Sequence, residues 1–351
     1  MNRRLKPRLV LKSPAWSEDP MQAEGTLLLR RIDVEELLSL GDCLDGVEEV
    51  FRLQGQGKIP PSEILAVRAR DGGLHVKAGF LPGGKSYIVA KLNSNFPGNR
   101  AQFQLPTIQG VIVVCDAENG SPLAILDSID ITVKRTAAAS AVAAKYLARK
   151  DSSVVTICGC GQQGRAQLRG IQAVLPLKKV YAFDVDPGAA RQLAIDLSRK
   201  LEIDIEPARD LASAIRKSDV CVTCTPAKEF FIHKEHVAWG TFIAAVGADD
   251  KHKQEIDPAL MASAKVVTDS LEQCCSIGDT HHAIAKGLMR EEDIYAELSE
   301  IAAGRKAGRV SADEIIVFDS TGLAIEDAVA AVAVYEKART FTVGSQFSFG
   351  G

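Results

Sequence analysis

The sequence lacks any long uninterrupted run of apolar residues, and no stretch approaches the roughly 18 needed to cross a bilayer. Its basic N-terminus has neither a long apolar segment nor a small-residue cleavage site, so it does not resemble a signal peptide. The net charge of −3 gives no general attraction to nucleic acid or to an anionic membrane. From these absences we expect a cytoplasmic protein that has neither nucleic acid nor membrane as a partner.

The eight cysteines lack the spacing of a zinc finger or of a catalytic redox pair. Cys158 and Cys160 flank a glycine, and Cys221 and Cys224 lie within an apolar run rather than at a helix start. The six histidines form no metal-binding pattern either. We therefore expect reduced structural thiols and no metal.

The length of 351 residues is about right for two domains. The 46% of hydrophobic and 25% of charged residues are ordinary for a globular protein. In the first part, two short helical patterns precede a series of strands separated by glycine-rich turns, which predicts an α+β domain with a largely antiparallel sheet. The expected helices are 34–40 and 44–53, and the expected strands are 64–68, 74–77, 87–92, 111–117 and 121–128.

The pattern changes at the alanine-rich residues 136–149, which predict a helix that connects the two domains. Regular alternation of strands and helices follows, as in an α/β domain with a parallel sheet. The strands are 154–158, 180–183, 220–224, 241–246, 266–268 and 315–318, and the helices are 162–175, 187–201, 208–217 and 324–338. Residues 344–351 show no regular pattern, and we expect a disordered tail.

A glycine motif follows the short apolar run of Val154, Val155, Ile157 and Cys158. Gly159, Gly161 and Gly164 stand in the spacing G-x-G-x-x-G. The first glycine allows a tight turn, the second lets a pyrophosphate approach the backbone, and the third lets helix and strand pack closely. The N-terminus of the following helix offers free N–H groups to phosphates. The strand before and the helix after the motif predict a dinucleotide-binding site.

Asp184 determines which dinucleotide we expect. It stands 20 residues after Gly164 (184 − 164), where an acidic side chain accepts hydrogen bonds from the ribose of NAD. A carboxylate at this position repels the 2′-phosphate of NADP, Asp186 adds to the repulsion, and no arginine follows in the next few positions. We therefore predict NAD as the cofactor.

Ligands of open parallel sheets bind beyond the carboxyl ends of the strands. This rule nominates Thr225, residues 246–249 and residues 319–322 as parts of the site. In the same order along the chain, five blocks resemble those of the ornithine cyclodeaminase/mu-crystallin family. These blocks are residues 91–99, residues 135–138, the glycine motif at residues 159–164, residues 246–249 with 253–255, and residues 319–327.

The resemblance covers about residues 60–340 and implies a fold and an activity. It implies a Rossmann domain at residues 149–318 and a substrate-binding and dimerisation domain built from both chain ends, 1–148 together with 319–351. It also implies a homodimer. Members of the family oxidise or reduce the Cα–N bond of small amino or imino acids that carry a carboxylate.

The resemblance also implies roles for single residues. Lys91 matches an active-site lysine that holds the substrate carboxylate or shuttles a proton, although a lysine at a strand edge is more often solvated. Arg135, which precedes the expected helix, matches an arginine that grips a carboxylate or phosphate. Arg68 matches a further carboxylate ligand, with Arg70 as a rival. Asp249 matches the catalytic aspartate that relays a proton.

The catalytic candidates are therefore Asp249 and Lys91. The substrate-binding candidates are Arg68, Lys77, Lys91 and Arg135. The cofactor-binding candidates are Arg135, Thr136, Gly159, Gly161, Gln162, Gln163, Gly164, Asp184, Thr225, Val246, Gly247 and Gly322.

One departure from the family pattern bears on the substrate. Ornithine cyclodeaminases carry a glutamate near residues 76–78 that meets the distal ammonium of the substrate, and here no acid is present. His75 and Lys77 occupy this stretch instead and share one face of a strand, because side chains alternate along strands. Cationic side chains disfavour ornithine and favour a neutral cyclic imine or a substrate with a second carboxylate.

Three functions follow as hypotheses. The first is an NAD-dependent imino-acid reductase or amino-acid dehydrogenase. The second is a cyclodeaminase, which recycles NAD within one turnover and releases ammonia. The third is a mu-crystallin-like protein that binds NAD(P)H and a small ligand without turnover, against which the presence of Lys91 and Asp249 argues.

Overall fold

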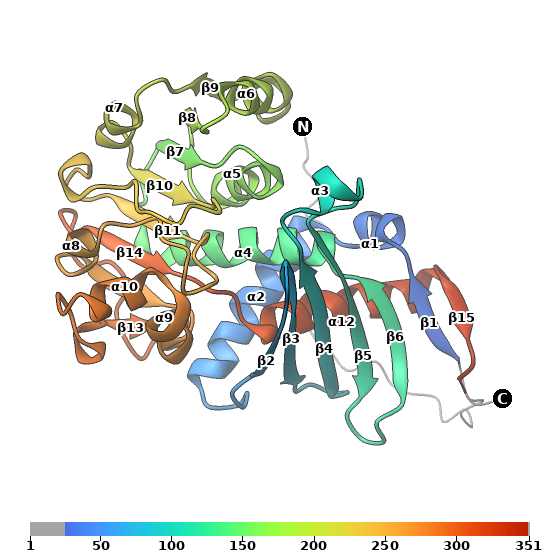
Figure 1. The fold of residues 1–351 in the computed structure, drawn as a ribbon. Coiled ribbons are helices and arrows are strands. Elements are labelled where there is room, and N and C mark those ends of the chain that lie inside the picture. Colours follow the sequence, from blue (N-terminus) through green and yellow to red (C-terminus); the bar gives the residue numbers. More distant parts are fainter. Residues whose placement is uncertain (1–24, 350–351) are drawn as a thin grey trace, which may run out of the picture.

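The computed structural model of the protein describes residues 25–349 and contains two β-sheets, one with seven strands and one with eight (Figure 1). The first sheet has the strand order β15-β1-β6-β5-β4-β3-β2. Its strands β2 to β6 are antiparallel, as expected, while β1 pairs parallel with β6 and antiparallel with β15. The strands are β1 Thr26–Leu29, β2 Glu63–Ala69, β3 Gly72–Leu81, β4 Tyr87–Asn95, β5 Ile108–Asp116, β6 Pro122–Asp127 and β15 Ser345–Phe347.

Two parts of this sheet differ from the expectation. The stretch before residue 34 contains β1, for which no strand was predicted, and the expected disordered tail contains β15. The two strands pair with each other from opposite ends of the chain, with Thr26 opposite Phe347. This partnership supplies hydrogen bonds that neither short segment could make alone, so the prediction of a wholly disordered tail was wrong.

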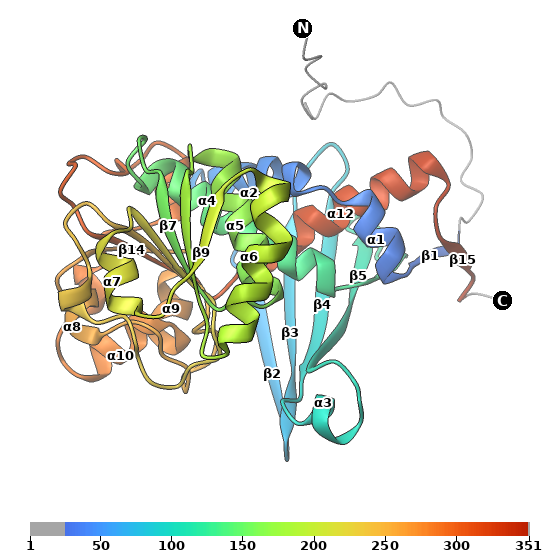
Figure 2. The same ribbon diagram turned by 90° about the horizontal axis from the view of Figure 1, so that it is seen from above.

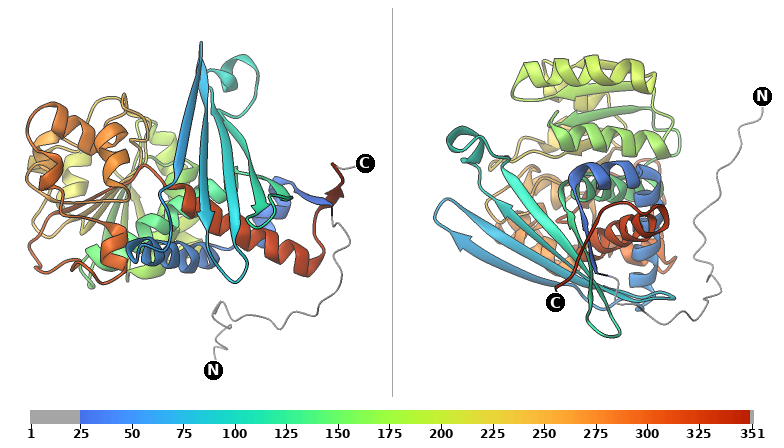
Figure 3. Two further views of the ribbon diagram at one scale, coloured as in Figure 1. Left: turned by 90° about the horizontal axis from the view of Figure 1, so that it is seen from below. Right: turned by 90° about the vertical axis from the view of Figure 1, so that its right-hand side faces the viewer.

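Helices cover one side of the seven-stranded sheet, and α12 runs across it (Figures 1 and 3). These helices are α1 Arg31–Leu37, α2 Leu40–Gly55, α4 Ile129–Leu147 and α12 Ala324–Phe341, and a short helix, α3 Asn99–Gln102, lies at the end of β4. Helix α4 begins seven residues before the expected start at residue 136 (136 − 129). Its first turns contain β-branched residues, which have weak helix propensity, but burial of Ile131 outweighs that preference. Arg135 therefore lies inside the helix and does not precede it.

The eight-stranded sheet is parallel throughout, with the order β13-β12-β14-β11-β10-β7-β8-β9. Its strands are β7 Val154–Cys158, β8 Lys179–Phe183, β9 Asp204–Pro207, β10 Val220–Thr223, β11 Phe242–Ala245, β12 Lys265–Thr268, β13 Ala296–Glu297 and β14 Ile316–Asp319. The connecting helices are α5 Gln162–Val174, α6 Pro187–Leu201, α7 Leu211–Arg216, α8 Pro258–Met261, α9 Leu271–Ile277, α10 Asp279–Ala285 and α11 Leu298–Ala302. This arrangement confirms the expected α/β fold with a Rossmann-like sheet.

Helix α4 lies between the two sheets, as expected of a connector (Figure 2). Its alanines 137–139, 141, 143 and 144 are buried. They pack so closely on α5 that a Cβ added to Gly170 would lie 2.7 Å from the carbonyl oxygen of Ala137. Small residues on both helices permit this approach, which fixes the glycine motif relative to the other sheet.

The chain passes between the sheets twice, first from α4 to β7 and later from β14 to α12. We call the second connection, residues 320–323, the crossover. The exact domain limits at residues 148 and 318 stay a prediction. All eight cysteines are free thiols. Within residues 25–349, no helix is both long and apolar enough to cross a membrane.

Candidate active site

The glycine motif has the geometry of a phosphate-binding turn between β7 and α5. Gly159 has φ +97°, a left-handed conformation that favours glycine. A Cβ on Gly164 would lie 1.9 Å from the carbonyl oxygen of Gly159, so only glycine lets the helix start so close to the strand. Gly161 faces open space, with nothing within 4 Å of an added Cβ. A pyrophosphate therefore has room beside Gly161, at the N-terminus of α5, and this fits a bound dinucleotide.

Asp184, directly after β8, lies beside this turn. Its Oδ2 accepts a hydrogen bond of 2.7 Å from the backbone N–H of Cys160, and its Oδ1 accepts one of 2.9 Å from the N–H of Asp186. These bonds hold the carboxylate against the turn while the side chain stays half-buried. Its contact with the cofactor ribose stays a prediction.

Glu255 holds together two loops that contain predicted cofactor residues. Its Oε1 accepts hydrogen bonds of 2.7 Å from both the N–H and the hydroxyl of Thr225. Its Oε2 accepts bonds of 2.7 Å from the Thr223 hydroxyl and 2.9 Å from the Gly247 N–H. The carboxylate is fully buried, and desolvation raises its pKa. Sequence reasoning gave Glu255 no role, although its place in a family block was a signal.

Lys91 and Arg135 meet two carboxylates at the first turn of α12. Arg135 donates to Asp327 Oδ1 at 2.9 Å and to Glu326 Oε2 at 2.7 Å, while Lys91 Nζ lies 2.5 Å from Asp327 Oδ2. Lys91 also donates to the Thr132 hydroxyl at 3.5 Å. All four charged side chains are buried, and the helix N-terminus favours the two carboxylates. The structure thus brings the two predicted cations, Lys91 and Arg135, to the same carboxylate of Asp327.

Burial shifts the protonation of this cluster. Desolvation lowers the pKa of Lys91 to about 8, and the positive charges of Arg135 and Lys77 add to the effect against the attraction of Asp327. Desolvation also acts on Arg135, but Asp327 and Glu326 outweigh it and keep the pKa of that guanidinium above its ordinary value. Lys91 is therefore charged at neutral pH but close to losing its proton, which suits a residue that both binds an anion and exchanges a proton.

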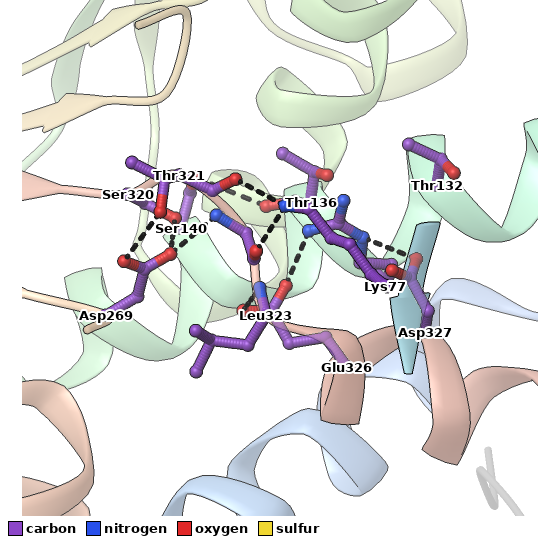
Figure 4. Close-up of polar contacts among 12 residues, drawn as sticks. Lys77, Thr132, Thr136, Ser140, Asp269, Ser320, Thr321, Leu323, Glu326 and Asp327 are labelled. Atoms are coloured by element: carbon purple, nitrogen blue, oxygen red, sulfur yellow. Dashed lines mark hydrogen bonds and ion pairs between the residues drawn. The ribbon is translucent and has the colours of Figure 1, made fainter. Parts of the chain in front are cut away.

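Lys77 lies next to Lys91 in the sheet, because the two residues are directly paired between β3 and β4. Its ammonium donates to the backbone carbonyls of Thr321 and Gly322 at 3.1 and 2.7 Å (Figure 4). Desolvation and the charge of Arg135 lower its pKa. The sequence argument listed Lys77 as a substrate-binding candidate, and in the structure its ammonium is hydrogen-bonded to the backbone of the crossover.

The pairing of β2, β3 and β4 shows where the two candidate arginines lie relative to Lys91. Arg68 is opposite Gly73, so it shares a sheet face with His75 and Lys77. Arg70 lies in the turn after β2. Both side chains are exposed, but Arg68 is on the face that carries Lys91, which favours it as the substrate-binding candidate.

Asp249 follows β11 and is about half exposed, with 55% of its side-chain surface accessible. Its Oδ1 lies 2.5 Å from Lys253 Nζ. Desolvation alone would raise its pKa, but the charges of Lys253, Lys77 and His75 outweigh this and hold the pKa below the usual value. Asp249 is therefore an ionised carboxylate, and the charges of Lys77 and His75 on β3 contribute to its stabilisation.

One group of possible metal ligands occurs among the described residues. The ligand atoms of His233, Glu235 and Asp257 lie within 4.8 Å of one another. Asp257 already accepts hydrogen bonds from the N–H groups of Ala259 and Lys234, at 2.9 and 3.4 Å. The carboxylate thus serves as the N-cap of α8, a structural use that needs no metal.

Comparison with known proteins identifies the family. The model of the ornithine cyclodeaminase/mu-crystallin family matches residues 24–341. The chain belongs to this family, and the resemblance inferred from the sequence blocks is confirmed.

Three solved structures show the same fold with a nicotinamide cofactor bound. An archaeal alanine dehydrogenase dimer with bound NAD is 39% identical, with TM-score 0.87, and the match covers 92% of this chain and 99% of that one. The pyrroline-2-carboxylate reductase of Thermococcus litoralis, with NADH and L-proline, is 36% identical, with TM-score 0.87 and coverage of 92% and 100%. The iminosuccinate reductase of Paracoccus denitrificans, with NAD⁺, is 32% identical, with TM-score 0.84 and coverage of 93% and 100%.

Proposed function

We propose that this protein is an NAD-dependent oxidoreductase that acts at the Cα–N bond of a small amino or imino acid. The observation that carries the proposal is the buried cluster of Lys91 and Arg135 at the crossover from the dinucleotide-binding sheet. A carboxylate ligand and a nicotinamide cofactor would meet at this junction. The alanine dehydrogenase, pyrroline-2-carboxylate reductase and iminosuccinate reductase described above all belong to this class of enzyme.

The cofactor is NAD, which supplies or accepts the hydride when bound. The open space at Gly161 and the N-terminus of α5 would receive its pyrophosphate. Asp184 would accept hydrogen bonds from its ribose and would repel the extra phosphate of NADP.

The substrate half of the reaction belongs to side chains of both parts of the chain. Lys91 and Arg135 would fix the substrate carboxylate, with Arg68 and His75 farther along the same sheet face. An anion at this place would raise the pKa of Lys91 by offsetting the positive charge around it. Asp249, an ionised carboxylate, would orient the substrate nitrogen and move its proton.

A screen of NADH oxidation tests the proposal. The candidate substrates are pyrroline-2-carboxylate, piperideine-2-carboxylate, and pyruvate, glyoxylate and oxaloacetate, each with ammonia or methylamine. We expect at least one to consume NADH, and an Asp249→Asn variant to lose kcat with that substrate. No oxidation with any substrate, despite tight NADH binding, would favour the mu-crystallin-like binding function instead.

A cyclodeaminase activity is separable from a reductase by stoichiometry. A reductase consumes one NADH for each product, whereas a cyclodeaminase releases ammonia without a net change in NADH. Lys77 beside Lys91 argues against a substrate with a second ammonium group, since like charges in a buried site repel. We therefore expect no ammonia release from ornithine.

The uncovered face of the seven-stranded sheet supports a homodimer. Leu65, Val76, Leu92 and Val111 are paired in a row across β2 to β5, on the opposite face from Lys91. Leu65 is 59% exposed and Val111 40% exposed, which is unusual for apolar side chains aligned on one face. The archaeal alanine dehydrogenase is a dimer. A second copy packed on this face would bury the row, and a Leu65→Arg change should shift light-scattering mass to the monomer.

A further inference from the structure

The crossover between the two sheets is held by charged side chains from both sides. Lys77, on β3 of the seven-stranded sheet, donates to the carbonyls of Thr321 and Gly322. Asp269, directly after β12 of the parallel sheet, accepts hydrogen bonds of 2.6 Å from the Gly322 N–H and 2.8 Å from the Ser320 hydroxyl. Both groups thus hold the same short segment, one by its carbonyls and the other by its N–H and hydroxyl groups (Figure 4).

We propose that Lys77 is a positioning residue that, together with Asp269, locks the crossover in place and does not bind the substrate carboxylate. An ammonium has three N–H donors, and the two carbonyls use two of them. The two carbonyls belong to consecutive residues and both accept from the same Nζ atom. One lysine therefore pairs both carbonyls, whereas an apolar side chain would leave both without a hydrogen-bond donor. The ammonium of Lys77 is therefore already engaged by the backbone of the crossover.

The position of the crossover affects Arg135, a predicted ligand of the substrate carboxylate, through Gly322. This residue has φ +80°, and a Cβ added to it would lie 2.5 Å from Nη1 of Arg135. The guanidinium therefore rests against the crossover backbone. Directly after Gly322, the Leu323 N–H donates to Glu326 at 3.2 Å, and Glu326 in turn accepts from Arg135. A displaced crossover would move Arg135 and the first turn of α12 together.

The same first turn reaches Lys91. Asp327 binds both Arg135 and Lys91, so the position of α12 sets the distance between the two predicted carboxylate ligands. Lys77 would thus affect the positions of Arg135 and Lys91 indirectly, through Gly322 and α12. The kinetic part of this inference rests on the proposed function, whereas the structural part does not.

The test uses the full-length protein with variants on either side of the crossover. Lys77→Met removes the donors to the carbonyls. Asp269→Asn replaces one acceptor oxygen of the carboxylate by an amide nitrogen, which cannot accept a hydrogen bond. Lys77→Arg keeps a charged multiple donor, and the double variant tests coupling. Lys85→Met is the matched control, because Lys85 lies in the turn between β3 and β4 and pairs with Asp116 at 3.0 Å.

Two readouts are measured for each variant. The first is hydrogen–deuterium exchange of a peptide covering residues 317–324, whose Gly322 amide is bound to Asp269. The second is steady-state kinetics, separated into the dissociation constant of NADH and kcat and KM for the best substrate of the screen. Exchange in the remaining peptides shows whether a variant is folded.

We expect Lys77→Met and Asp269→Asn each to speed exchange in this peptide and to lower kcat/KM roughly 10- to 100-fold, since small displacements of binding groups have effects of this size. The double variant should lose less than the product of the two single effects, because both act on one segment. Lys77→Arg should restore most of the activity, and Lys85→Met should behave like the unchanged protein.

Other outcomes overturn the inference. If Lys77→Met raises only the KM for the substrate, leaves exchange at residues 317–324 unchanged and combines multiplicatively with Asp269→Asn, Lys77 is a substrate ligand. If the unchanged protein oxidises no NADH but both variants still speed exchange, the lock stands and the proposed function fails. If Asp269→Asn does not fold, Ser320→Ala takes its place, because it removes one bond to the same carboxylate.

Discussion

The buried Lys91 should determine how the binding of a carboxylate depends on pH. Lys91 has a pKa of about 8, against an ordinary value of 10.5, because burial and neighbouring positive charges disfavour its charged form. At 1.36 kcal/mol for each pKa unit, this difference means that the protein environment disfavours the charged form of Lys91 by roughly 3 kcal/mol. A bound carboxylate needs the charged form, so binding should weaken as the pH rises through about 8.

Above that pH, affinity should fall about tenfold for each further pH unit, as expected when one proton is needed for binding. The assay is competitive inhibition by pyruvate without any amine, because its carboxylate does not titrate in this range. A Lys91→Arg variant should lose the dependence, since a guanidinium stays charged. Lys85→Arg serves as the control and should keep it. Affinity that stays constant from pH 7 to 10, or an unchanged dependence in Lys91→Arg, would refute the assignment of the charge to Lys91.

Three further predictions follow from other carboxylates. Asp184→Ser should raise the KM for NADH roughly tenfold or more, because charge-assisted hydrogen bonds are lost. It should also reduce the preference for NADH over NADPH, and steady-state kinetics with both cofactors measure both effects. Glu255→Gln cannot accept all four bonds from the Thr225 and Gly247 loops, so urea denaturation should show a loss of about 1–3 kcal/mol for a buried group left unpaired, with weaker NADH binding; unchanged stability would contradict the role of Glu255. Burial raises the pKa of Asp319 from 3.8 to about 7, so the folded state holds a proton that the unfolded state releases, and stability should decline as the pH rises from about 4 to 7. Asp319→Asn should remove that part of the decline in pH-dependent denaturation curves.

Local sequence signals were sufficient for the glycine motif and for six of the eight strands of the parallel sheet, whereas the short strands β9 and β13 were not predicted. Gly159, Gly161 and Gly164 carry geometric requirements in their spacing, and the strand before them is apolar except for the buried Thr156. The alternation of strands and helices from residue 154 onward is equally local. These features were predictable because each one depends on neighbours a few residues away.

Contacts between distant parts of the chain were not predictable in this way. Strands β1 and β15 are four and three residues long and pair from opposite ends of the chain, so neither segment carries a pattern of its own. The start of α4 was missed because the β-branched residues before Thr136 disfavour a helix in isolation, while tertiary burial stabilises one. Short segments of this kind depend on the rest of the fold.

The candidate site shows the same division. Lys91, Arg135 and Asp249 were predicted from family blocks, and the structure adds how their charges are balanced. The partners of Arg135 are 191 and 192 residues away in the sequence, which no local pattern could reveal. The bonds from Lys77 to the crossover span 244 and 245 residues, so the role predicted for Lys77 from the sequence differs most from what the structure indicates.

Hydride transfer to the substrate Cα is the central claim, and deuterium from labelled NADH tests it directly. The protein is supplied with NADH that carries deuterium at the transferable C4 position, together with the best imino acid of the screen, and the amino-acid product is analysed by mass spectrometry and proton NMR. We predict one deuterium at Cα for each NADH consumed. A product without deuterium at Cα, or product formed without loss of NADH, would contradict the account.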